Sequence, residues 1–226
     1  QDTIVSGGFT GNFGELQNII DDADEYDIIY LQKDYKGSGE ITIDKELYID
    51  GLGHSINAQG KSRIFDISSD VVLENITFLN GNGGNTNGGA IYSTSYLEIY
   101  RCSFAYNVAD MGGAVSSDDY TLVEDCLFYE NHALTGGGAI YSYHLFVGKN
   151  SIFFNNTADE YGGSIYGYDL GVVDSSFLSY DEMEFIDFYN NEKEGLELYL
   201  KNNTMYGVNS YYIWQESLDP ITSPVT

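Results

Sequence analysis

Apolar and polar residues alternate in short runs along most of this chain, and these runs lack a helical period. Alternation over three to five residues is typical of strands that bury one face. Early in the chain such runs stand at residues 28–31, 41–43, 47–49 and 64–67. One segment differs, because Phe13, Leu16, Ile19 and Ile20 follow spacings of 3, 3 and 1. That spacing predicts a short amphipathic helix.

A four-residue motif recurs at a nearly constant step in the second half of the chain. Two glycines, then Ala or Ser, then Ile or Val occupy residues 88–91, 112–115, 137–140 and 162–165, with offsets of 24, 25 and 25. A second marker keeps this step, namely Phe78, Phe104, Phe128, Phe153 and Phe177, three of them followed three residues later by Asn107, Asn131 and Asn156. A fixed period of this length indicates a solenoid.

A unit of 24–25 residues cannot close a core alone and must stack on its neighbours. We therefore expect an all-β fold, a right-handed parallel β-helix with three short strands per turn. Dividing 226 residues by 25 gives about nine turns, and the short helix would cap the N-terminal end. The distance from Phe to the next glycine pair varies as 10, 8, 9 and 9, so insertions belong in the loop before the pair.

The expected organisation is a single β-helix domain over residues 1–226. Residues 1–25 form the N-terminal cap, 26–69 irregular early turns, 70–205 the repeat turns, and 206–226 the C-terminal end and the start of a linker. Alignment on Phe predicts two inward columns: Leu73, Ile99, Val123, Gly148 and Val172, and Ile76, Cys102, Cys126, Ser151 and Ser175. Cys102 and Cys126 stand 24 apart, so reduced core thiols are favoured and a disulfide is the alternative.

The recurring glycines and asparagines receive an architectural interpretation. A glycine pair fits a corner where a Cβ would clash or where positive φ is needed, and Ala or Ser after it fits a narrow interior. The recurring Asn predicts a ladder of stacked side-chain amides.

The net charge of the chain limits the classes of partner that it can bind. The chain has 9 basic and 35 acidic residues, a formal net charge of −26. Phosphate binding needs clustered Lys and Arg, so nucleic acid and anionic membrane surfaces are excluded as main partners. No apolar run approaches 18 residues, so we expect no membrane insertion by this segment.

The motifs Gly-Gly-Ala-Ile and Phe-x-x-Asn, at residues 88–91, 104–107, 128–131, 137–140 and 153–156, resemble the repeats of chlamydial polymorphic outer-membrane proteins. Residues 47–53 complete a resemblance to archaeal adhesin-like proteins of methanogens, which combine such repeats with a stretch of this kind. Both resemblances imply a pectin-lyase-like β-helix on the extracellular cell surface. They further imply a non-catalytic adhesin whose partner is a protein or glycan of another cell's surface.

Two alternatives stay open. A polysaccharide lyase or hydrolase of the pectin-lyase-like class would need paired carboxylates, or calcium with a basic residue as proton acceptor. The chain has only two arginines, Arg63 and Arg101, lacks the polygalacturonase motif blocks, and places His54 in a turn-like segment. The second alternative is an inert surface stalk.

One column of polar residues has metal-binding chemistry. Seven residues after the first glycine of each pair stand Ser95, Asp119, His144 and Asp169. Successive turns would place Asp119, His144 and Asp169 about 5 Å apart from one turn to the next. These three residues form a weak candidate metal column. We favour a solvated turn and expect no metal and no cofactor. Ca²⁺ at the acidic runs 21–25 and 181–184 has no dedicated motif to support it.

The predicted binding surface is a strip of tyrosines. The residue after the inward Ile or Val must point outward, as must the residue two further on. We call Tyr92, Tyr141, Tyr143, Tyr166 and Tyr168, with Asp118 at their edge, the tyrosine strip. Stacked tyrosines offer large area for sugar rings or a basic protein surface. Alternatively, their cross-strand stacking only stabilises the sheet.

Overall fold

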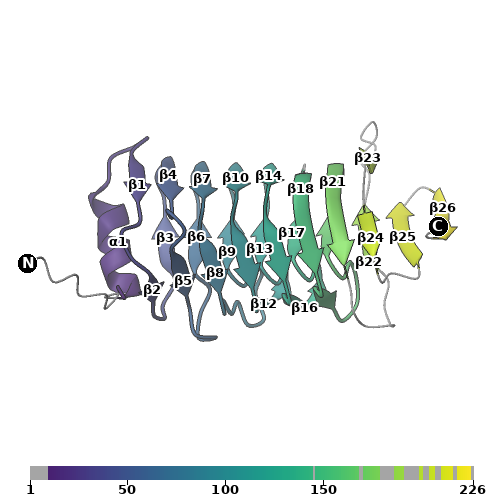
Figure 1. Cartoon of the computed structure of the whole chain (residues 1–226), viewed down its shortest axis with the longest axis horizontal. Helices are drawn as coiled ribbons and strands as arrows, with labels where there is room; N and C mark the ends of the chain where they lie inside the picture. The colour runs from purple at the N-terminus through teal and green to yellow at the C-terminus, as the bar shows by residue number, and fades with distance from the viewer. Residues whose placement is uncertain are drawn as a thin grey trace, which may run out of the picture.

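The short alternating runs coil into a parallel β-solenoid in which each strand pairs with the equivalent strand of the next turn (Figure 1). The structure is a computed structural model that describes residues 10–144, 146–167, 170–178, 186–190, 199–200, 204–206, 210–215 and 218–224. Side-chain surroundings are described as far as residue 167. The all-β class and the parallel stacking expected from the repeat are confirmed.

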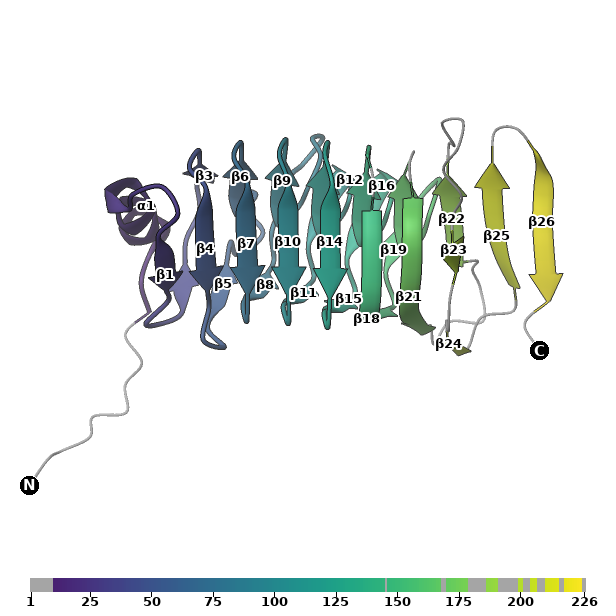
Figure 2. The same ribbon diagram turned by 90° about the horizontal axis from the view of Figure 1, so that it is seen from above.

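Three ladders run along the solenoid. The first face contains β1 (Ile28–Tyr30), β4 (Leu47–Asp50), β7 (Val71–Glu74), β10 (Leu97–Tyr100) and β14 (Thr121–Glu124), which lie side by side in Figure 2. The second face contains β2 (Tyr35–Lys36), β5 (Ser55–Asn57), β8 (Thr77–Leu79), β11 (Ser103–Ala105), β15 (Leu127–Tyr129) and β24 (Thr204–Tyr206). The third face contains β3 (Ile41–Ile43), β6 (Phe65–Ile67), β9 (Ile91–Ser93), β13 (Val115–Ser117), β17 (Ile140–Ser142), β20 (Ile165–Gly167), β22 (Ile186–Asn190) and β25 (Ser210–Gln215).

The remaining strands connect or end these ladders. β18 (Phe146–Phe154) and β21 (Leu170–Leu178) run through the corner between the first and second faces, and β23 (Tyr199–Leu200) pairs with β21. β12 (Val108–Met111), β16 (His132–Gly136) and β19 (Thr157–Ala158) form a small sheet just before the glycine pairs. β26 (Leu218–Pro224) pairs antiparallel with β25. The segment of variable length before the glycine pairs thus contains short strands, and the register between β12 and β16 shifts by one residue between Ala109 and Met111.

The number of turns differs slightly from the estimate of nine: the solenoid has about six turns as far as residue 167, and β22 and β25 continue the third face beyond them. Dividing the length by one period counted the N-terminal segment and α1 as coils. The early turns lack the glycine marker, yet β1, β4 and β7 share one ladder with the later strands. Strands β2 and β5 were not foreseen from the pattern.

Stacked side chains fill the interior as the Phe alignment predicted. Leu73, Ile99 and Val123 are fully buried, and so are the rings of the Phe marker as far as Phe153. The rings of Phe78, Phe104, Phe128 and Phe153 stack with centroids 4.8 Å apart at each step. This distance equals the strand spacing, so every turn adds one ring to a continuous stack.

Both thiols are free and buried, in agreement with the favoured interpretation. The backbone N–H of Cys102 donates to Sγ of Cys126 at 3.4 Å. Burial raises the pKa of the Cys126 thiol to about 12 and that of Cys102 well above its ordinary value.

The two positions of each glycine pair require glycine for different structural reasons. The first has positive φ, for example +65° at Gly112 and +67° at Gly137. At the second, a Cβ on Gly113 would lie 2.2 Å from the carbonyl oxygen of Gly138, so the backbones of neighbouring turns approach too closely for any side chain.

Helix α1 (Phe13–Asp22) covers the N-terminal end of the solenoid (Figure 1). Asn12 caps it by accepting from the N–H of Glu15 at 2.9 Å. Phe13, Leu16 and Ile20 are buried, whereas Ile19 is 41% exposed and lies outside the buried face that the spacing suggested.

Gln17 closes the exposed edge of β3. Its side-chain amide donates to the carbonyl of Thr42 at 3.0 Å and accepts from the N–H of Thr42 at 2.8 Å. The amide therefore replaces the strand that a preceding turn would supply. None of the helices in the described residues is long and apolar enough to cross a membrane.

Candidate functional site

The tyrosine strip is only partly exposed. Tyr92 and Tyr166 are half-buried, Tyr143 is 45% exposed, and Tyr168 lies outside the described residues. Tyr141 is 5% exposed and its ring packs 5.4 Å from that of Tyr166. The strip is therefore no continuous open platform, and Tyr141 cannot present its ring to a partner. The binding role of the strip stays a prediction.

Tyr92 is engaged by its neighbours. Its hydroxyl donates to Oδ2 of Asp118 at 2.6 Å, and the guanidinium of Arg63 lies over its ring at 5.2 Å. The hydrogen bond to Asp118, followed by burial, raises the pKa of Tyr92 to about 12. These contacts favour the alternative in which tyrosines of the strip stabilise the sheet.

Arg63 links three successive segments of the solenoid. Its side chain is 10% exposed and pairs with Glu40 at 2.5 Å. It also donates to the carbonyls of Gly88 at 2.9 Å and Asn87 at 2.8 Å. With Tyr92, it lines a polar pocket of about 400 Å³. The guanidinium is thus committed to holding the loop before the glycine pair.

The candidate metal column lies on a repeated turn. Oγ of Ser117 donates to the carbonyl of Asp119 at 3.0 Å, and Oγ of Ser142 donates to that of His144 at 2.8 Å. Asp119 is exposed, and Asp169 falls outside the described residues. Among the residues that can be described, no three His, Cys, Asp or Glu side chains gather as metal ligands would. Both the solvated turn and the weak metal column therefore stay predictions.

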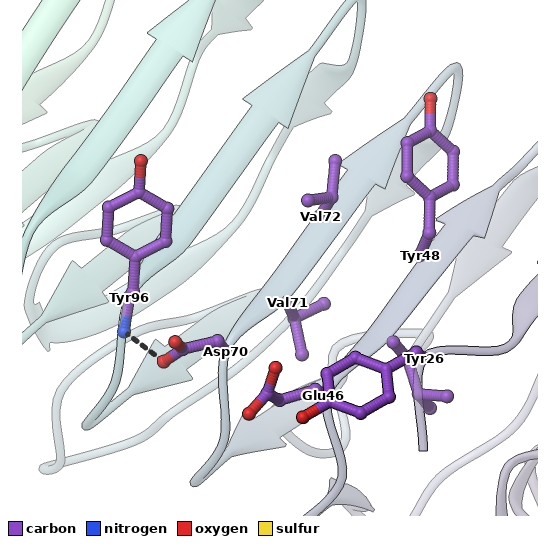
Figure 3. A pocket seen from close by; sticks show the side chains of 8 residues that line it. Tyr26, Glu46, Tyr48, Asp70, Val71, Val72 and Tyr96 are labelled. Carbon is purple, nitrogen blue, oxygen red and sulfur yellow. Dashed lines mark hydrogen bonds between the residues drawn. The ribbon is translucent and has the colours of Figure 1, made fainter. Parts of the chain in front are cut away.

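Sequence reasoning missed a pocket of about 340 Å³ on the outer side of the first face. We call it the tyrosine pocket; it is lined by Tyr26, Glu46, Leu47, Tyr48, Asp70, Val71, Val72 and Tyr96. Figure 3 shows the carboxylates of Glu46 and Asp70 between the rings of Tyr26 and Tyr96. Leu47 and Val71 are buried and form its floor. Its volume lies in the range of small-ligand sites.

The wall at Tyr96 is fixed in place. Its ring stacks on that of Tyr120, with centroids 4.8 Å apart and planes at 6°. Its hydroxyl donates to Oε1 of Glu98 at 2.6 Å, while the hydroxyl of Tyr100 donates to Oε2 at 2.6 Å. The bond to Glu98 is the main cause that raises the pKa of Tyr96 to about 12. Tyr96 is 36% exposed, so a preorganised ring faces solvent.

None of the described residues that line the tyrosine pocket is cationic. The carboxylate of Glu25 accepts the N–H of Glu46 at 2.8 Å and adds negative charge beside it. Lys45 is adjacent in sequence, but its Nζ donates to the carbonyls of Asp21 and Ala23 at 2.6 and 2.7 Å. That lysine stabilises the C-terminal end of α1 instead.

The row of Tyr26, Glu46, Asp70 and Tyr96 has steps of 20, 24 and 26 residues. This irregularity explains why a search for the 24–25-residue period passed over it. The signal that could have found it is the position immediately before the buried residues Leu47, Val71 and Leu97.

A comparison with known protein families finds similarity to one repeat family. The Chlamydia polymorphic membrane protein repeat matches residues 125–143 and 150–168. Each stretch contains one Phe-x-x-Asn motif and one glycine pair, so the matched unit is the repeat of the solenoid. No curated protein and no solved structure matches the chain. The matched stretches cover a small part of the sequence. They show that these turns of the β-solenoid are similar to this repeat.

Proposed function

We propose that this chain is a non-catalytic adhesion domain, displayed on the extracellular surface of a cell, that attaches to a protein or glycan of another cell. The observation that carries the proposal is the match of residues 125–143 and 150–168 to a repeat of membrane proteins. The finer resemblance to archaeal adhesin-like proteins stays a prediction.

The outer surface supports recognition over an inert stalk. A stalk needs only the internal stacks, which the Phe rings and the column of Leu73, Ile99 and Val123 supply. This chain also exposes tyrosines on several faces, among them Tyr26 at 75%, Tyr106 at 47% and Tyr143 at 45%. Exposed aromatic residues are typical of contact surfaces.

The contacts of the two arginines and of His54 support a non-catalytic role. A lyase needs a basic residue free to take a proton. Arg63 is held by Glu40 and two backbone carbonyls, and Arg101 pairs with Glu74. The ring of His54 lies 3.3 Å from a carboxylate oxygen of Asp34. The pKa of Asp34 is lowered, mainly because its carboxylate accepts a hydrogen bond from the backbone N–H of Ser55. Burial opposes this shift, and the hydrogen bond with His54 adds to it.

A bead assay tests the proposal. Beads coated with the chain should attach to cells of at least one type, and soluble chain should displace them. Beads coated with an unrelated protein of equal net charge serve as the control, because −26 charges alone attract basic surfaces. In parallel, polysaccharides incubated with the chain should release no reducing or unsaturated sugar ends. Release of such ends without stable attachment would establish the enzyme instead.

A further inference from the structure

The tyrosine pocket follows the long axis of the solenoid. Tyr26, Glu46, Asp70 and Tyr96 occupy equivalent register positions just before β1, β4, β7 and β10. Neighbouring strands lie about 4.8 Å apart, so the two tyrosines at its ends are roughly 14 Å apart. Two carboxylates occupy the interval, and Tyr48 and Val72 stand beside them on the next outward positions (Figure 3).

These groups suit a positively charged side chain. A tyrosine ring attracts a cation placed over its face, and a carboxylate pairs with it directly. The aliphatic stem of such a side chain would pack on Val72 above the buried floor of Leu47 and Val71. A planar guanidinium can stack on a ring and bind a carboxylate with two N–H groups at once.

Among the residues that the structure describes, no basic side chain pairs with the carboxylates around the pocket. Glu46 and Asp70 line it, Glu25 and Glu98 border it, and Lys45 is held by the carbonyls at the end of α1. Each carboxylate added to one site without a counter-ion raises the electrostatic attraction for a cationic ligand.

Hydrogen-bonding capacity separates a basic protein segment from a neutral glycan. A sugar hydroxyl both donates and accepts, whereas a guanidinium or ammonium only donates. Carboxylates only accept, and the hydroxyl proton of Tyr96 is already given to Glu98. The pocket is therefore richer in acceptors than in donors.

We infer that the tyrosine pocket binds arginine or lysine side chains from a basic segment of a partner protein. The inference rests on the proposed adhesive function and names the chemistry of its partner. The contact residues are Tyr26, Glu46, Tyr48, Asp70 and Tyr96.

The test is calorimetric titration of the whole chain with the capped peptide Gly-Arg-Gly-Arg-Gly and with its citrulline counterpart, which keeps the shape and removes the charge. We expect binding of the arginine peptide alone. The variant Glu46→Gln/Asp70→Asn should weaken it about tenfold, the sum of two surface charge contacts. The control Asp159→Asn/Glu160→Gln removes the same charge from exposed positions elsewhere and should leave the affinity unchanged.

Tyr96→Leu should weaken the peptide about two- to fivefold, since one exposed cation–π contact is lost. Thermal unfolding of each variant checks that the solenoid is intact. Three results would overturn the inference: no binding of the arginine peptide, equal weakening by the two double variants, or binding of a neutral glucose oligomer at this pocket in place of the peptide.

The bead assay keeps the two proposals apart. If the chain binds the peptide specifically but its beads attach to no cell, the adhesive function is refuted and the inference about the pocket is supported. Attachment that persists in a chain that fails to bind the peptide would remove the pocket and leave the adhesive function standing.

Discussion

The side-chain amide of Asn107 donates a hydrogen bond to Oδ1 of Asn131, 2.9 Å away, and Asn131 makes the same bond to Asn156. Each amide also donates to a Phe carbonyl of the preceding turn, at 3.3 Å for Asn107 and 3.0 Å for Asn131. Asn107 and Asn131 are fully buried. The Phe-x-x-Asn motif therefore joins a stack of rings to a ladder of satisfied amides, which gives it a structural reason independent of any partner.

Asn131→Ala should lower the free energy of unfolding by about 2–5 kcal/mol. Oδ1 of Asn131 accepts from both the backbone N–H and the amide of Asn107, so two buried donors would lose their acceptor. Urea denaturation measures the change, with Asn85→Ala as the control in an exposed loop. Equal stability of the two variants would refute the ladder as a source of stability.

Gly113→Ala should destabilise the protein by more than about 3 kcal/mol, the upper end for overpacked cores, because the clashing atoms are backbone. The new Cβ would lie 2.2 Å from the carbonyl oxygen of Gly138 and 2.5 Å from that of His132. Gly84→Ala is the comparison. It has φ +61° with nothing within 4 Å, so only backbone strain of about 1–2 kcal/mol is expected. If thermal unfolding showed Gly84→Ala to be more destabilising than Gly113→Ala, close contact between turns would not be the reason for glycine at this corner.

Neither thiol should react with a thiol reagent at pH 8 in the folded protein. Cys102 and Cys126 are 1% and 3% exposed, and burial raises the pKa of both thiols. After unfolding without reductant, titration should count two thiols. A count of zero would reveal a disulfide.

Stability should fall between about pH 9 and 12, in part through Cys126. Burial raises the pKa of this thiol from 9.0 to about 12, so in this interval the unfolded chain has lost a proton that the folded chain keeps. The unfolded state then binds fewer protons, and the free energy of unfolding decreases as pH rises. Cys126→Ser should flatten this decrease, since the equivalent buried position of the next turn is Ser151. Denaturant midpoints across this pH range measure it; identical slopes would contradict the shift.

The repeat predicted the interior better than the surface. Phe104 and Asn107 recur at one period because every turn needs the same inward shape, and that constraint is visible in sequence. Outward positions carry no such constraint. Alternation shows that Tyr92 and Tyr141 point away from the core, but whether other segments cover them depends on packing that no local pattern contains.

The tyrosine pocket escaped prediction for a related reason. Its end residues, Tyr26 and Tyr96, come from an early turn and a repeat turn, and the step between turns changes from 20 to 26 residues along the row. Register between strands, which only the structure supplies, brings them to one groove. The candidate metal column of Asp119, His144 and Asp169 stays a prediction, because Asp169 lies outside the described residues.

The last prediction separates the structural from the binding role of the tyrosine strip. Tyr141→Ser should cost about 3 kcal/mol of unfolding free energy, the lower end for loss of a buried aromatic side chain, because this ring is 5% exposed and packs on Tyr166. Tyr143→Ser removes a ring that is 45% exposed and should change stability by less than about 0.5 kcal/mol. With the strip in a mainly structural role, beads carrying Tyr143→Ser should attach to cells as the unaltered chain does. Attachment lost in this stable variant would place the binding surface on the third face and contradict the assignment to the tyrosine pocket.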